Sequence, residues 1–212
     1  MRDERGFNLS SVWFIVGINI ILFIFTSLYP ELKSQLGLQA KSYESLAGLE
    51  PGFIEQPWTI LTSIFVHDGF FHIFGNMVTL YFLGTYLTMV IGEAKFMATY
   101  LLGGLLGGAV VLLWAFYSPW AGPSDPFVDH IGASGAVFAV GGALAVLRPK
   151  AQVALFFVIP MPLWVGIAVI FVFLTFLSLA FPISWQAHLG GLLLGLTAGF
   201  VFRKTDRYRP LR

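Results

Sequence analysis

The chain has 212 residues, of which 57% are hydrophobic and only 11% are charged, with a net charge of +1 at pH 7 and no cysteine. This composition, together with 22 Phe, 23 Gly and a mean hydropathy of +0.81, is typical of an integral membrane protein built as one domain. It excludes disulfides, thiol catalysis and cysteine-based metal sites, and it gives no support to nucleic-acid binding.

Six apolar segments follow one another along the chain, and we expect each to be a transmembrane helix of a single domain, residues 1–212. The expected spans are about 12–29, 69–91, 96–117, 134–147, 163–181 and 185–202. The sequence therefore predicts an all-α polytopic membrane protein.

A long, more polar stretch, residues 30–68, separates the first two expected spans. Loops of this length tend to be functional or disordered. Its later part, 58–66, is apolar and contains Trp58, a residue type favoured at membrane interfaces. We expect this part to lie partly in the interface.

The fourth segment is too short to cross a bilayer upright. Its 14 residues, from Ser134 to Leu147, would reach roughly 21 Å as a helix, whereas the hydrocarbon core is about 30 Å thick. If Arg148 at its basic end lies at one membrane face, Ser134 must lie inside the membrane, below the other face.

The last two segments follow a long apolar run that Pro160 and Pro162 interrupt, and we expect an interfacial piece up to Pro162. The sixth segment contains Gly191, Gly195 and Gly199 at a spacing of four. This spacing lines the three glycines up on one stripe, against which another helix can lie closely.

Basic residues predict the orientation. With six spans both termini share a side, and ten of the twelve basic residues fall on it, leaving only Lys33 and Lys41 on the other. The ten are Arg2, Arg5, Lys95, Arg148, Lys150, Arg203, Lys204, Arg207, Arg209 and Arg212. By the positive-inside rule we expect cytoplasmic termini in a plasma membrane, with stretch 30–68 outside and the basic tail against anionic lipid.

Four polar groups are expected at one depth near the outer face. Ser134 lies 14 residues from Arg148, and His188 lies 15 residues from Arg203. At helical rise these separations correspond to roughly 21 and 22 Å. Asn76 lies 16 residues from Gly92, and His72 is one turn further along the same face.

These groups suit acyl transfer. A serine hydroxyl becomes a strong nucleophile when a neutral histidine takes its proton, so Ser134 and His188 are the candidate pair. A developing oxyanion needs donors, which His72, Asn76 and the backbone N–H of Ser134 would provide. Flanking glycines at 132 and 135 would let the backbone turn these donors toward a substrate.

The same residues resemble a known family. Gly-Ala-Ser-Gly at 132–135, His72 followed four residues later by Asn76, and Ala187-His188 opening a helix of Gly-xxx-Gly pattern are similar to rhomboid intramembrane serine proteases. The resemblance implies a Ser134–His188 dyad with oxyanion stabilisation by His72 and Asn76. It also implies cleavage of transmembrane substrates near the extracytoplasmic face through an acyl-enzyme, without metal or cofactor.

Two positions depart from the family pattern. Where many bacterial members have Trp-Arg, Trp58 is followed by Thr59. Where a tyrosine often supports the histidine ring, this chain has Phe138, which can stack on an imidazole but offers no hydroxyl. Phe138 is therefore expected to act as a supporting residue, together with Gly132 and Gly135.

Other interpretations remain open at this point. The chain could be a proteolytically inactive relative that binds membrane proteins for trafficking or quality control. His72 and His188 could instead bind haem or form a proton path, whereas a zinc protease is disfavoured because no His-Glu-xx-His helix exists. Asp129 is a weak candidate for a third catalytic member, and His67 is interpreted as structural.

Overall fold

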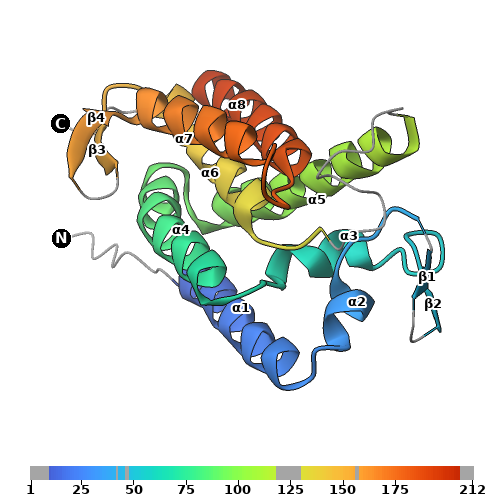
Figure 1. Cartoon of the computed structure of the whole chain (residues 1–212). Coiled ribbons are helices and arrows are strands. Elements are labelled where there is room, and N and C mark those ends of the chain that lie inside the picture. Colours follow the sequence, from blue (N-terminus) through green and yellow to red (C-terminus); the bar gives the residue numbers. More distant parts are fainter. Residues whose placement is uncertain (1–9, 42, 46–47, 118–129, 156–157, 206–212) are drawn as a thin grey trace.

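Helices dominate the computed structural model, which describes residues 10–41, 43–45, 48–117, 130–155 and 158–205 (Figure 1). The principal helices are α1 (Ser10–Leu28), α4 (Phe70–Ile91), α5 (Glu93–Tyr117), α6 (Ser134–Leu147), α7 (Leu163–Leu177) and α8 (Trp185–Thr205). Five basic residues of the orientation argument, namely Arg2, Arg5, Arg207, Arg209 and Arg212, lie outside the described residues, as does Asp129.

Four of these helices are long and apolar enough to cross a membrane. They are α1 from Ser11 onward, α4, α5 and α8. Helices α6 and α7 are apolar but shorter, at 14 and 15 residues. The fold is thus mostly helical and of the kind expected for a multi-pass membrane protein.

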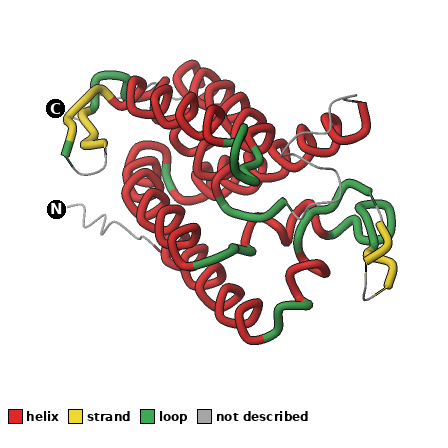
Figure 2. The backbone as a smooth tube through the Cα atoms, viewed as in Figure 1, coloured by secondary structure: helices red, strands yellow, loops and turns green. Residues whose placement is uncertain are grey.

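Two short hairpins correct the all-α prediction. In the stretch 30–68, β1 (Tyr43–Ser45) pairs with β2 (Gly48–Glu50), and the short helices α2 (Leu32–Leu36), α3 (Thr59–Thr62) and η1 (Ser63–Phe65) surround this hairpin in sequence. Between α6 and α7, β3 (Gln152–Leu155) pairs with β4 (Ile159–Pro162). The hairpins lie at opposite ends of the molecule, as the yellow segments of Figure 2 show.

The prolines explain the second hairpin. Pro160 and Pro162 lack a backbone N–H, which disfavours a helix through them but is tolerated in an edge strand. The register pairs Gln152 with Pro162 and Ala154 with Pro160. The piece expected at the interface is therefore a β-hairpin, and α7 begins directly after Pro162.

Glycine separates α4 from α5. Gly92 has a φ of 85°, in the left-handed region that favours glycine, and its N–H donates to the carbonyl of Thr88. Glu93 then opens α5, where an acidic residue complements the positive end of a helix. The chain can therefore reverse direction within one residue.

Helix α6 is the centre of the fold. It packs against α4, α5, α7 and α8, and eleven of its 14 residues are buried. Figure 1 shows it in yellow among these neighbours. Among the described residues, α6 is the only short apolar helix that is enclosed in this way, and Ser134 is its first residue.

The glycine stripe of α8 lies against α6, as predicted. A Cβ at Gly191 would overlap the carbonyl of Gly135, and a Cβ at Gly195 would overlap the carbonyl of Ala139. The two backbones therefore touch, which leaves no room for a side chain between them. Because Gly191 follows His188 by one turn, this crossing also fixes His188 relative to the start of α6.

Candidate active site

A serine and a histidine from two helices meet at the start of α6. His188 Nε2 lies 2.8 Å from Ser134 Oγ, a hydrogen-bond distance. Ser134 is the first residue of α6 and His188 lies in the first turn of α8. The imidazole is 3% exposed. At this distance Nε2 can accept the hydroxyl proton, which is the geometry a general base requires.

Packing orients the His188 ring. Its Nδ1 has no hydrogen-bond partner among the described residues. The ring of Phe138 lies 4.8 Å from the imidazole, centroid to centroid, at an interplanar angle of 37°. Phe138 in turn contacts Phe171 of α7 edge to face. Among the described residues, aromatic packing therefore orients the His188 ring without a hydrogen bond to Nδ1.

The two glycines beside Ser134 have different tasks. Gly132 has a φ of 124°, and a Cβ there would lie 2.6 Å from His72 Nε2. Gly135 lies within α6, where a Cβ would lie 2.9 Å from the carbonyl oxygen of Ala187. Gly132 therefore lies in a backbone turn next to His72, whereas Gly135 allows the close approach of α8.

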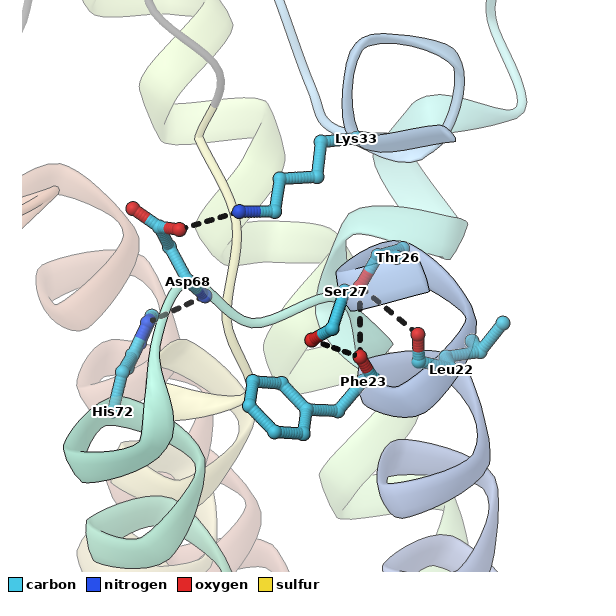
Figure 3. Close-up of polar contacts among 7 residues, drawn as sticks. All are labelled: Leu22, Phe23, Thr26, Ser27, Lys33, Asp68 and His72. Atoms are coloured by element: carbon cyan, nitrogen blue, oxygen red, sulfur yellow. Dashed lines mark hydrogen bonds and ion pairs between the residues drawn. The ribbon is translucent and has the colours of Figure 1, made fainter. Parts of the chain in front are cut away.

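His72 approaches the same serine loop from α4. Its Nε2 faces Gly132, as the close approach of a Cβ at that position indicates. Its Nδ1 accepts a hydrogen bond from the backbone N–H of Asp68, with 3.4 Å between the nitrogens (Figure 3). In a neutral ring the proton then resides on Nε2, so that a donor faces the loop preceding Ser134.

Asn76, one turn along α4, has its amide engaged within its own helix. Asn76 Nδ2 donates to the carbonyl of His72 at 3.0 Å. The side chain is buried, with 8% exposure. Since an amide nitrogen has two hydrogens, this bond uses one and leaves the other for a further acceptor.

His67 supports the backbone just before the serine. The residue is fully buried, and its Nε2 accepts a hydrogen bond from the N–H of Ala133 at 3.3 Å. Its ring also packs edge to face on His72, with 4.9 Å between centroids. Burial, and then the nearby His72, lower the pKa of His67 to about 3. A neutral imidazole is therefore part of the scaffold at neutral pH.

This burial predicts a pH dependence of stability. Folded His67 binds a proton only near pH 3, whereas an unfolded histidine does so below about 6.5. The unfolded state thus gains protons first as the pH falls, so the contribution is complete above about 6.5 and declines below it. Thermal unfolding in detergent between about pH 7.5 and 5 should show a smaller decline for His67→Gln than for the unmodified protein. Equal declines would contradict this assignment.

Sequence reasoning missed a second serine–histidine contact. His130 Nδ1 lies 2.5 Å from Ser184 Oγ, and the backbone of His130 pairs with Leu38. This pair spans 54 positions, as does the pair Ser134 and His188. The shared separation could have revealed the contact between His130 and Ser184. A crossing that brings Ser134 to His188 also brings together the two residues four positions earlier.

The site shows no metal-binding cluster in the described part of the chain, where no group of three His, Cys, Asp or Glu side chains could hold an ion. Of the two intramembrane histidines considered as haem ligands, His188 has its Nε2 bonded to Ser134. His72 has its Nδ1 bonded to the backbone N–H of Asp68.

Known proteins match most of the chain. The family model described as Rhomboid domain matches residues 54–205. An uncharacterized protein of Mycobacterium tuberculosis is 28% identical, over 92% of this chain and 78% of its own length. "Rhomboid protein 1, mitochondrial" of Saccharomyces cerevisiae is 28% identical, over 95% of this chain and 56% of its own length. "Inactive RHOMBOID-like protein 8" of Arabidopsis thaliana is 32% identical, over 46% of this chain and 29% of its own length.

Proposed function

The chain belongs to the rhomboid family, and from this premise we propose that it is an intramembrane serine endopeptidase that cleaves transmembrane proteins near the extracytoplasmic membrane face. The observation on which the proposal rests is the 2.8 Å contact between His188 Nε2 and Ser134 Oγ. A serine hydroxyl bonded to a buried imidazole is the arrangement that activates a hydroxyl for attack on a peptide carbonyl.

The first half of the reaction forms an acyl-enzyme. Ser134 Oγ attacks the scissile carbonyl carbon while His188 Nε2 takes the hydroxyl proton. The tetrahedral intermediate then collapses, and the carbon–nitrogen bond breaks as His188 gives its proton to the leaving amine. Phe138 packs against the imidazole and thereby holds the ring in its orientation.

The negative oxygen of the intermediate needs donors that are already in place. The Nε2–H of His72, the free amide hydrogen of Asn76 and the N–H of Ser134 at the start of α6 are the donors we propose. The positive end of the α6 dipole adds to the attraction. His67 contributes by holding the N–H of Ala133, one residue before Ser134.

The second half of the reaction consumes water. His188 takes a proton from a water molecule, whose oxygen attacks the ester carbon. The ester bond breaks and the proton returns to Ser134 Oγ, which restores the enzyme. Hydrolysis inside a membrane requires a polar, water-accessible path to this depth, and we propose that the stretch 30–68 or α7 leaves such a path open.

We propose that all six apolar helices cross the membrane, with α6 starting inside it. The opposite placement of the two hairpins supports this arrangement, since β1–β2 belongs to the stretch assigned outside and β3–β4 follows basic Arg148 and Lys150 (Figure 2). Cytoplasmic termini and a plasma-membrane location remain part of the proposal. Both rest on the distribution of the basic residues. The yeast relative, in contrast, is named as a mitochondrial protein.

The main competing function is that of an inactive relative that binds membrane proteins. The name of the Arabidopsis relative provides the reason to consider it. The retention of both Ser134 and His188 in hydrogen-bond contact favours the protease, because a binding factor has no use for an activated hydroxyl.

The two functions separate in a reconstituted cleavage assay. The full chain in liposomes should cut a single-span reporter protein, and the masses of the two products should locate the cut near one membrane face. The soluble domains of the same reporter, without its span, are the control and should stay intact. Binding of the span without any cleavage across a panel of such reporters would favour the inactive relative.

A further inference from the structure

A short chain of contacts leads from the loop after α1 to His72. Lys33 of α2 lies 2.6 Å from the carboxylate of Asp68, measured from Nζ to Oδ1. The backbone N–H of the same Asp68 donates to His72 Nδ1 at 3.4 Å. Figure 3 shows the lysine and the histidine on opposite sides of Asp68. One residue thus presents its main chain to the ring and its side chain to the lysine.

The main-chain contact selects a tautomer. His72 is the third residue of α4, and Asp68 lies just before Gly69, which caps the helix. A side chain at the third helical position that accepts from a backbone N–H ahead of the helix resembles one half of a capping box. An acceptor at Nδ1 requires the proton of a neutral ring to be on Nε2, the atom facing Gly132.

In another orientation, the carboxylate of Asp68 would change the position of the proton on the His72 ring. It belongs to the residue whose amide touches Nδ1, so a rotation of its side chain would bring an acceptor to the same ring nitrogen. A carboxylate there would draw the proton onto Nδ1. Nε2 would then face the serine loop as an acceptor and could no longer donate a hydrogen bond. The ion pair with Lys33 holds the carboxylate on the far side.

We propose that Lys33 is a positioning residue for His72, because it holds the Asp68 carboxylate away while the Asp68 N–H keeps the imidazole proton on Nε2. The inference rests on the proposed function of His72 as an oxyanion donor. It assigns a role in catalysis to a lysine of the loop after α1, at a distance from every reacting atom. The proposal also implies that the carboxylate of Asp68 is dispensable as long as the backbone N–H of this residue is retained.

Nitrogen-15 NMR tests the tautomer without any activity. The chain has only four histidines, so a histidine-labelled sample gives a small spectrum in which loss of a signal pair in His72→Gln identifies His72. The unmodified protein and Asp68→Ala should both have the proton on Nε2, since Ala keeps the backbone N–H. Lys33→Met should move the proton toward Nδ1. A proton on Nδ1 in the unmodified protein would overturn the inference.

Cleavage kinetics supply a rescue test. Loss of one oxyanion donor costs about 10²- to 10³-fold in kcat, so a partly shifted tautomer in Lys33→Met should lower kcat about tenfold with little change in KM. Asp68→Ala and the double variant Lys33→Met/Asp68→Ala should both stay within about twofold of the unmodified protein. Lys41→Met, which removes an exposed lysine of the same loop, is the control.

The outcomes separate cleanly. An ordinary structural ion pair would make Asp68→Ala as harmful as Lys33→Met, and the double variant would not recover; either result would overturn the inference, as would full activity of Lys33→Met. If the unmodified protein cuts no reporter, the proposed function fails, and the nitrogen-15 spectra still decide whether Lys33 controls the tautomer.

Discussion

Ser134→Ala is expected to abolish proteolysis while the protein stays folded. The hydroxyl is the only group that the proposed reaction joins to the substrate, and it lies 2.8 Å from its base. In a well-studied serine protease, removal of the catalytic serine or histidine lowers kcat by a factor on the order of 10⁶. His188→Ala should therefore have a similar effect. Reporter cleavage in liposomes measures the rate, and thermal unfolding in detergent measures the fold.

Ser184→Ala is the matched control. Like Ser134, Ser184 bonds to a histidine that lies 54 positions away in the sequence. The distance from Ser184 Oγ to His130 Nδ1 is 2.5 Å. The proposed reaction makes no use of this hydroxyl, so the variant should keep most of its activity. Substantial cleavage by Ser134→Ala, or equal losses in both serine variants, would contradict the assignment of the nucleophile.

The second large effect is expected from one added methyl group. Gly191→Ala would place a Cβ on the carbonyl of Gly135, where the backbones of α8 and α6 touch. The helices must separate, which typically costs about 1 to 3 kcal/mol for an overpacked core. Separation also moves His188 from Ser134, and a displacement of about 1 Å can lower the rate about 10²-fold. Thermal unfolding and reporter cleavage should both detect the change.

Gly17→Ala in α1 is the control for this variant. A Cβ at Gly17 would meet no heavy atom within 4 Å. Alanine is the better helix former, so this substitution should be neutral or slightly stabilising, by up to about 1 kcal/mol. If Gly191→Ala behaved like Gly17→Ala in both assays, the contact between α6 and α8 would not set the position of the dyad.

Regular geometry explains why part of the site was predictable from sequence. Each helical residue advances by a constant rise, so counting from Arg148 and Arg203 set Ser134 level with His188. The spacing of Gly191 and Gly195 indicated a close crossing for the same reason. These predictions needed only helix periodicity and a basic end for each segment.

Features made by irregular chain were not predictable in this way. The ion pair of Lys33 with Asp68 depends on how the loop after α1 folds back to α4, which no period in the sequence describes. The β3–β4 hairpin required Pro160 and Pro162 to be interpreted as strand residues as well as helix breakers. The close contact of Gly135 with the carbonyl of Ala187 was not predicted either, because the two residues are far apart in sequence.

The most direct test of an activated serine in this fold is covalent labelling by a fluorophosphonate. The phosphorus should form a bond to Ser134 Oγ with loss of fluoride, and mass spectrometry of the digested protein should locate the adduct on the peptide containing residues 132–135. His188→Ala should lose the label although it retains the serine. An unlabelled Ser134 in a folded protein, or a label that persists in His188→Ala, would contradict the account.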